Sequence, residues 1–234
     1  PRLMLKRQVA LAAKKGYRMK TGIEAEFFLI NEDGSAISDP RDTQGKPCYD
    51  QTALMRRFDV VAEICDSMET LGWAPYQNDH EDANGQFEMN YDYCDTLQSA
   101  DRHVFFKFMV KSIAEEHDLR ATFMPKPIAG DNGTGMHVNM SIWKDGKPLF
   151  AGDKYADLSD EALYFIGGIL QHAKALNAFT NPSTNSYKRL IPGYEAPVLL
   201  AYSSRNRSAS CRIPHVNSPA GKRVEVRFPD ATAN

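Results

Sequence analysis

Residues 21–30 constrain the fold of this chain more than any other segment, because apolar and charged residues alternate along them. Apolar residues at positions 23, 25, 27 and 29 alternate with Glu24 and Glu26. Successive side chains of a strand point to opposite faces of a sheet, so this pattern predicts a strand with one face in the core. The other face carries two carboxylates. The chain must therefore build a sheet with an apolar side and an acidic side.

The rest of the chain divides into amphipathic helices and hairpins. Apolar residues at helical spacing predict helices over residues 2–15, 51–71, 96–117 and 160–178, and alternation predicts strands over residues 136–143, 147–150 and 222–228. Asn84-Gly85 and Asp145-Gly146 predict tight hairpin turns, because both dipeptides accept positive φ angles. Helices and hairpins without regular βαβ alternation predict a single α+β domain built on an antiparallel sheet.

Composition excludes several classes of protein. The chain has 234 residues, 42% of them hydrophobic and 25% charged, and a net charge of −2, which is typical of a folded domain without a nucleic-acid partner. Its apolar runs are far shorter than the roughly 20 residues of a membrane-spanning helix, so no membrane partner is expected. Basic residues are spread through the first twenty positions, and the four cysteines form no CxxC pair. We therefore expect a cytoplasmic protein with reduced thiols.

The predicted hairpin at Asn84-Gly85 brings two further carboxylates together, Glu81 and Glu88. Like charges at this spacing repel one another unless a cation lies between them. Paired carboxylates therefore favour a hard, oxygen-seeking ion such as Mg²⁺ or Mn²⁺. Taken alone, each acidic motif also fits a solvated strand face or a surface hairpin.

The strand predicted over residues 136–143 has a polar face of a similar kind. Alternation places His137, Asn139 and Ser141 on one side and apolar residues on the other. The glycine-rich turn before it, residues 130–135, has a backbone that can approach a substrate closely. A lone histidine in such a strand also fits a purely structural role.

An arginine-rich segment near the end of the chain has the opposite charge. Residues 188–227 contain eight basic side chains, six of them arginine, and only Glu195 and Glu225 as acids. Alternation puts Arg223, Glu225 and Arg227 on one face, which predicts a carboxylate between two guanidinium groups. The planar guanidinium matches carboxylate or phosphate oxygens, although a solvated basic face or a nucleic-acid patch also fits. Carboxylates and arginines together favour metal-assisted phosphoryl transfer, without a P-loop or kinase motif.

Five segments of the sequence resemble the glutamine synthetase family: residues 22–27, 132–137, 181–197, 205–214 and 223–230. The resemblance extends over nearly the whole chain from Gly22, in the same order. It implies a strongly curved antiparallel sheet flanked by helices. It also implies that ATP phosphorylates the γ-carboxylate of glutamate and that ammonia then displaces phosphate.

The resemblance implies a role for each matching residue. Glu26, Glu81 and Glu88 would hold one divalent ion beside glutamate and ammonium, and Glu24, His137 and Glu225 a second ion on the ATP phosphates. Asn132, Gly133, Arg189 and Arg227 would bind glutamate, and Tyr49 would line the ammonium pocket. Arg207, Arg212 and Arg223 would contact the phosphates, with Ser141 and Asn139 near the nucleotide. Glu195 would lie on a flap and help to deprotonate ammonium, so Glu195, Arg207 and Arg227 form the catalytic set.

Two departures from the family pattern leave the amine open. Asn139 stands where many bacterial members have a second histidine, and the hairpin from Glu81 to Glu88 is one residue short. Both features resemble divergent branches that include glutamate–methylamine ligases. A non-catalytic structural or nucleic-acid-binding relative is the alternative from another class. By the resemblance, residues 1–234 form a single catalytic-domain fragment without the small N-terminal domain and a C-terminal portion. We expect it to be inactive alone and the full-length protein to form a ring-shaped homo-oligomer.

Overall fold

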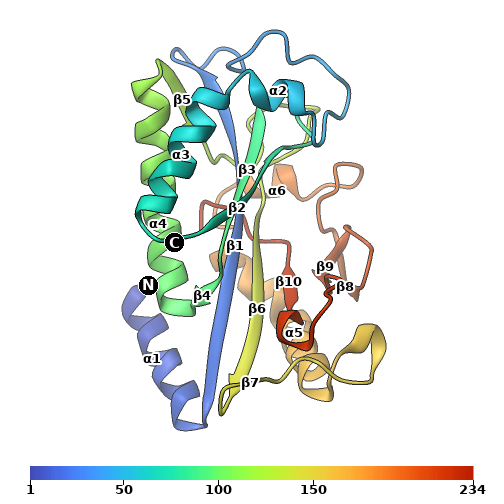
Figure 1. The fold of residues 1–234 in the computed structure, drawn as a ribbon. Helices are drawn as coiled ribbons and strands as arrows, with labels where there is room; N and C mark the ends of the chain where they lie inside the picture. The colour runs from blue at the N-terminus through green and yellow to red at the C-terminus, as the bar shows by residue number, and fades with distance from the viewer. Residues whose placement is uncertain (234) are drawn as a thin grey trace.

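The architecture, obtained as a computed structural model that describes residues 1–233, is one ten-stranded sheet with helices packed on it. The strands are β1 (Tyr17–Asn31), β2 (Pro75–His80), β3 (Gln86–Tyr91), β4 (Cys94–Asp95), β5 (Leu119–Thr122), β6 (Met136–Lys144), β7 (Lys147–Pro148), β8 (Leu199–Ser203), β9 (Ala209–Arg212) and β10 (Val224–Val226). The sheet order is β2-β3-β1-β6-β10-β9-β8, with β4 and β5 paired to β1 and β7 paired to β6. Figure 1 shows β1 and β6 side by side along the length of the molecule.

Six helices accompany the sheet within residues 1–233. They are α1 (Arg2–Lys14), α2 (Gln51–Met55), α3 (Phe58–Thr70), α4 (Thr96–Glu116), α5 (Asp160–Thr180) and α6 (Ser186–Arg189), together with two short 3₁₀ turns at Tyr155–Asp157 and Pro219–Gly221. None of the helices in the described part of the chain has a stretch apolar and long enough to span a bilayer.

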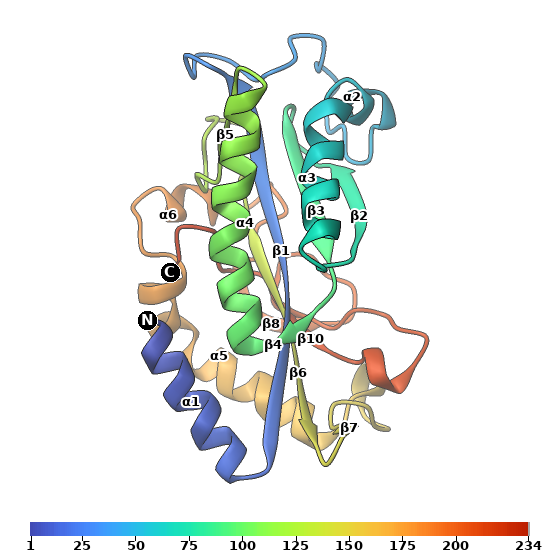
Figure 2. The same cartoon turned by 60° about the vertical axis from the view of Figure 1, so that its left-hand side comes forward.

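The alternation in β1 produces the two-sided sheet that the sequence predicts. Ile23, Ala25, Phe27 and Leu29 are buried against apolar side chains of α3 and α4, which lie over β1 and β3 in Figure 2. A second apolar cluster joins β9 and β10 to α5. Because both clusters take the apolar positions of these strands, the opposite positions are left to form a polar face.

Several predictions about the elements are wrong in detail. The helix predicted over residues 51–71 is broken between α2 and α3, where Arg57 has φ −122° and ψ 23°. Both arginines at the break bind the preceding loop: Arg56 forms an ion pair with Asp39, and Arg57 Nε donates to Ser38 Oγ at 2.9 Å. These two long-range contacts compete with continuation of the helix, and the spacing of apolar residues does not reveal them. The strand predicted over residues 222–228 is also shorter in the structure, where it is β10.

The sheet is also not wholly antiparallel, because β8 pairs with β9 in parallel. The strands β4, β5, β8 and β9 and helix α6 have no counterpart among the predicted elements. The turn at Asp145-Gly146 forms as predicted, with φ values of 50° and 75°. At Asn84-Gly85 only the glycine has positive φ, at 76°, and the connection begins at Glu81, whose amide donates to the Gln86 carbonyl at 2.8 Å. This turn is therefore wider than the predicted two-residue turn.

Candidate active site

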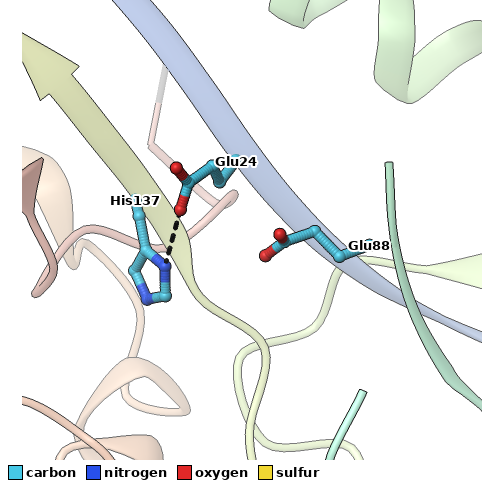
Figure 3. Close-up of side chains that lie close together, drawn as sticks. All are labelled: Glu24, Glu88 and His137. Atoms are coloured by element: carbon cyan, nitrogen blue, oxygen red, sulfur yellow. Dashed lines mark ion pairs between the residues drawn. The ribbon is translucent and has the colours of Figure 1, made fainter. Parts of the chain in front are cut away.

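The central strands bring three potential metal ligands together. Strand β1 lies between β6 and β3, and the register sets Glu24 opposite His137 and Glu26 opposite Glu88. One ligand atom from each of Glu24, Glu88 and His137 lies within 4.8 Å of the others. Figure 3 shows these side chains converging from the three strands, with His137 Nδ1 3.5 Å from Glu24 Oε2. The predicted acidic face is therefore a cluster rather than a dispersed surface.

Glu26 lies beside this cluster and is held by its neighbours. Its Oε2 atom accepts hydrogen bonds from Gln86 Nε2 and from the Gly135 amide, both at 2.8 Å. Gln86 is not among the residues predicted for the site, and it also donates to the Gly133 carbonyl at 3.1 Å. Gln86 thus ties the acidic face to the glycine-rich turn.

Burial and mutual repulsion perturb the acidic side chains. Burial first, and then the neighbouring charges of Glu24 and Glu81, raise the pKa of Glu88 well above its usual value. Burial and the charge of Glu26 raise the pKa of Glu81 to about 8. Burial and nearby arginines lower the pKa of His137 well below its usual value, so the imidazole is neutral at pH 7. Neutral imidazole and crowded carboxylates are suitable ligands for a divalent cation.

Glu225 is fully buried and joins the acidic cluster to the arginines. Its Oε1 atom accepts from Arg227 Nη1 at 2.6 Å and lies 3.5 Å from His137 Nδ1, while Oε2 bonds to Arg212 Nε. The two guanidinium partners are thus Arg212 and Arg227, which corrects the predicted pair of Arg223 and Arg227. The reason is that Arg212 lies directly opposite Glu225 across β9 and β10.

Arg223 belongs to a different contact. It donates from Nε to Asn139 Oδ1 at 2.8 Å, and Asn139 Nδ2 donates to Glu24 Oε1 at 2.7 Å. Arg223, Asn139 and Ser141 line a cavity of about 350 Å³, together with Lys20 and several tyrosines that the sequence analysis did not identify. The amide of Asn139 therefore links this cavity to the acidic face.

A smaller cavity of about 90 Å³ collects most of the other predicted residues. Its lining includes Glu24, Glu26, Tyr49, Glu81, Glu88, Asn132, Gly133, His137, Arg189, Glu195, Arg207, Arg212 and Arg227, and also Gln86, Tyr194 and Ala196, which were not predicted. Glu24 lines both cavities. Acidic side chains and arginines thus form the walls of one cavity, next to a second and larger one.

The arginines of this cavity are held in different ways. Arg189 is buried and donates to the main-chain carbonyls of Phe228 and Arg227, each at 3.0 Å. Arg207 forms an ion pair with Glu195 at 2.8 Å. Several of the Arg189 donors are thus occupied by main-chain carbonyls, which spacing along the sequence does not predict.

Comparison with known proteins gives a consistent result. The family model described as "Glutamine synthetase, catalytic domain" matches residues 1–234. A glutamine synthetase of Rhizobium meliloti is 56% identical over 100% of this chain and 55% of its own length, and one of Azorhizobium caulinodans is 60% identical over 91% and 51%.

Solved structures agree with these relatives. The structure described as "Apo GmaS without ligand" is 58% identical with a TM-score of 0.92, covering 100% of this chain and 54% of its own. Plasmodium falciparum glutamine synthetase is 32% identical with a TM-score of 0.86, covering 100% and 52%. The chain spans about half the length of the curated relatives it matches. Since the family model covers the whole chain, this chain belongs to the glutamine synthetase family.

Proposed function

We propose that the protein uses ATP to join ammonia to the γ-carboxylate of L-glutamate, giving glutamine, ADP and phosphate through γ-glutamyl phosphate. The observation that carries the proposal is the cavity in which Glu24, Glu88 and His137 converge next to Arg207, Arg212 and Arg227. Relatives that are 55 to 60% identical and named glutamine synthetase support it. Cations would bind to the carboxylates and phosphates to the arginines of the same cavity.

The donor set fits hard divalent ions, Mg²⁺ or Mn²⁺. Its ligand atoms are carboxylate oxygens and one neutral imidazole, and the raised pKa values of Glu81 and Glu88 reflect charge that a cation would neutralise. We propose that one ion binds to Glu24, His137 and Glu225. A second ion would bind to Glu26, Glu81 and Glu88. Glu88 also lies close to Glu24 and His137 of the first set. Bound ions would polarise the phosphate oxygens.

The residues of the chain would perform the remaining tasks. Arg207, Arg212 and Arg227 would stabilise the negative charge on the transferred phosphoryl group. Asn132 and Gly133, with Arg189 behind them, would orient glutamate. Glu195, whose side chain is 42% exposed beside the cavity, would accept a proton from ammonium near Tyr49.

The larger cavity would bind the nucleotide. Ser141, Asn139 and Arg223 line it, and Glu24 connects it to the smaller cavity. A structure described as "GmaS/ADP complex-Conformation 1", 55% identical to this chain with a TM-score of 0.90, supports ADP as a ligand. We further propose that residues 1–234 are the catalytic portion of a cytoplasmic protein that works as a ring-shaped homo-oligomer.

A second candidate is glutamate–methylamine ligase. By the family resemblance, Asn139 stands where many bacterial members have a second histidine, and this favours the second candidate. In the structure Asn139 links Glu24 to Arg223. The decisive experiment measures phosphate release by the full-length protein with ATP, glutamate, Mg²⁺ or Mn²⁺, and either ammonium or methylamine. A kcat/KM about tenfold higher with methylamine, about 1.4 kcal/mol, would assign methylamine as the acceptor.

The same measurement tests the non-catalytic alternative. Absence of phosphate release with either amine, combined with absence of Mn²⁺ binding, would support a structural or nucleic-acid-binding relative instead. Nucleic-acid binding with a steep salt dependence would then be expected.

A further inference from the structure

Lys126 is a buried cation next to the candidate site. It belongs to the loop that connects β5 to β6, and the residue is only 7% exposed. Its Nζ atom lies 3.9 Å from the centroid of the Tyr194 ring and donates to the main-chain carbonyl of Asp131. Its main chain is fixed by Asn185, whose Oδ1 accepts from the Lys126 amide at 2.7 Å and whose Nδ2 donates to the Lys126 carbonyl at 3.1 Å. The side chain therefore extends from a rigid base.

The two partners of the ammonium group belong to two different segments that contribute to the cavity lining. Asp131 directly precedes Asn132 and Gly133, and Tyr194 directly precedes Glu195. The segments are more than fifty residues apart in sequence. One ammonium group thus contacts both the turn that would hold glutamate and the turn that carries Glu195.

The turn at Glu195 needs such support. Glu195 has φ +56°, in the left-handed region that non-glycine residues rarely occupy, and Gly193 has φ +93°. The Glu195 side chain forms an ion pair with Arg207, but both side chains are more than 40% exposed, so solvent weakens this contact. A cation–π contact made by a desolvated ammonium group is stronger. The Lys126–Tyr194 contact is therefore the main candidate for holding the turn.

We propose that Lys126 is a positioning residue that couples the 130–135 turn to the Tyr194–Glu195 turn and so fixes the distance between the two sides of the cavity. The ammonium group donates one hydrogen bond to the Asp131 carbonyl and makes a cation–π contact with the Tyr194 ring. Its effect on catalysis rests on the proposed function, whereas its effect on the two turns does not.

Hydrogen exchange measured by mass spectrometry on the full-length protein tests the coupling without reference to activity. Lys126→Met and Tyr194→Leu should each speed amide exchange in residues 130–135 and 191–198 by about tenfold, because each removes the Lys126–Tyr194 contact. Tyr194→Phe keeps the aromatic ring, so amide exchange in both turns should stay as slow as in the unmodified protein. The control is Lys107→Met on α4. It removes a similar hydrogen bond, from Lys107 Nζ to the Ala231 carbonyl at 2.8 Å, and should leave amide exchange in both turns unchanged.

The double variant Lys126→Met/Tyr194→Leu should exchange no faster than Lys126→Met, because that single variant already removes the contact with Tyr194. Additive effects, unchanged exchange in Lys126→Met, or fast exchange in Tyr194→Phe would each overturn the proposal. If Lys126→Met fails to fold in a thermal melt, the comparison of Tyr194→Leu with Tyr194→Phe still decides.

Kinetics of phosphate release provide the second measurement. Lys126→Met should raise the KM for glutamate and lower kcat, each by about tenfold, while the KM for ATP changes less than twofold. Equal effects on both substrates would overturn the positioning role. If the unmodified protein lacks ligase activity, the proposed function fails, and the exchange experiment still decides on Lys126.

Discussion

Replacing Gly133 by alanine should distort the smaller cavity without unfolding the chain. A Cβ atom there would lie 2.5 Å from the Pro125 carbonyl oxygen and 2.8 Å from Cγ of Arg189. Neither neighbour can retreat easily: the Pro125 carbonyl accepts from the Thr134 amide at 2.8 Å, and the Arg189 guanidinium is bonded to carbonyls of residues 227–229. Restoring an ordinary contact of 3.4 Å to Pro125 therefore requires a movement of about 0.9 Å.

A displacement of about 1 Å in a substrate-positioning group typically costs about 100-fold in rate. The kcat/KM of Gly133→Ala for glutamate should thus fall about 100-fold, or about 2.7 kcal/mol, in phosphate-release assays of the full-length protein. The matched control is Gly168→Ala on α5, where, apart from its chain neighbours and the nearby helix backbone, no atom of the described chain lies within 4 Å of the added Cβ. It should add about 0.5 to 1 kcal/mol of helix stability and leave kcat/KM unchanged. A folded Gly133→Ala protein with kcat/KM within twofold of the original would refute this reasoning.

Three further predictions concern stability. Burial and Lys107 lower the pKa of His103 from 6.5 to about 4, so this histidine takes up a proton on unfolding below pH 6.5. Stability should fall by about 2 kcal/mol from pH 6.5 to 5 in urea unfolding, and His103→Leu should lack this loss; parallel profiles would contradict it. The raised pKa of Glu81, about 8, means that metal-free protein loses stability as pH rises from 4.5 to 8. Thermal melts should show that Mn²⁺ or Glu81→Gln reduces this loss, whereas the exposed-site control Glu116→Gln does not. Asp50 accepts from the Thr52 amide at 2.8 Å at the start of α2, so Asp50→Ala should cost about 1 kcal/mol in urea unfolding, and no change would contradict a capping role.

The sequence predicted the site better where chemistry depends on strand alternation than where it depends on pairing between strands. Alternation alone identified the face of Glu24 and Glu26, because side-chain direction in a strand follows from position. The pairing of Glu24 with His137 depends on the β1–β6 register, which residues distant in sequence determine. The partner of Glu225 was assigned wrongly for the same reason, since β9 carries Arg212 and was not predicted as a strand.

Helix prediction failed for a related physical reason. Spacing of apolar residues predicts one helix through Arg56 and Arg57, and no local signal opposes it. The break arises from contacts with Asp39 and Ser38, nearly twenty residues earlier in the chain. The surroundings of Arg189 also depend on folding: the family resemblance implies a role in binding glutamate, and the structure adds hydrogen bonds to three buried carbonyls. A buried polar group requires a hydrogen-bond partner, and the partners that are within reach are known only after the chain has folded.

The distribution of ion pairs explains how one cavity can attract both cations and anions. Glu225 is neutralised by two arginines, and Glu195 by Arg207, so these acids contribute little net negative charge. No ion pair with an arginine or lysine occurs for Glu24 or Glu88 within residues 1–233. Carboxylates without a basic partner are therefore concentrated on the β1 and β3 side of the cavity. A buried charge without a counter-ion is costly, so the acidic wall should be the part of the fold that depends most on a bound cation.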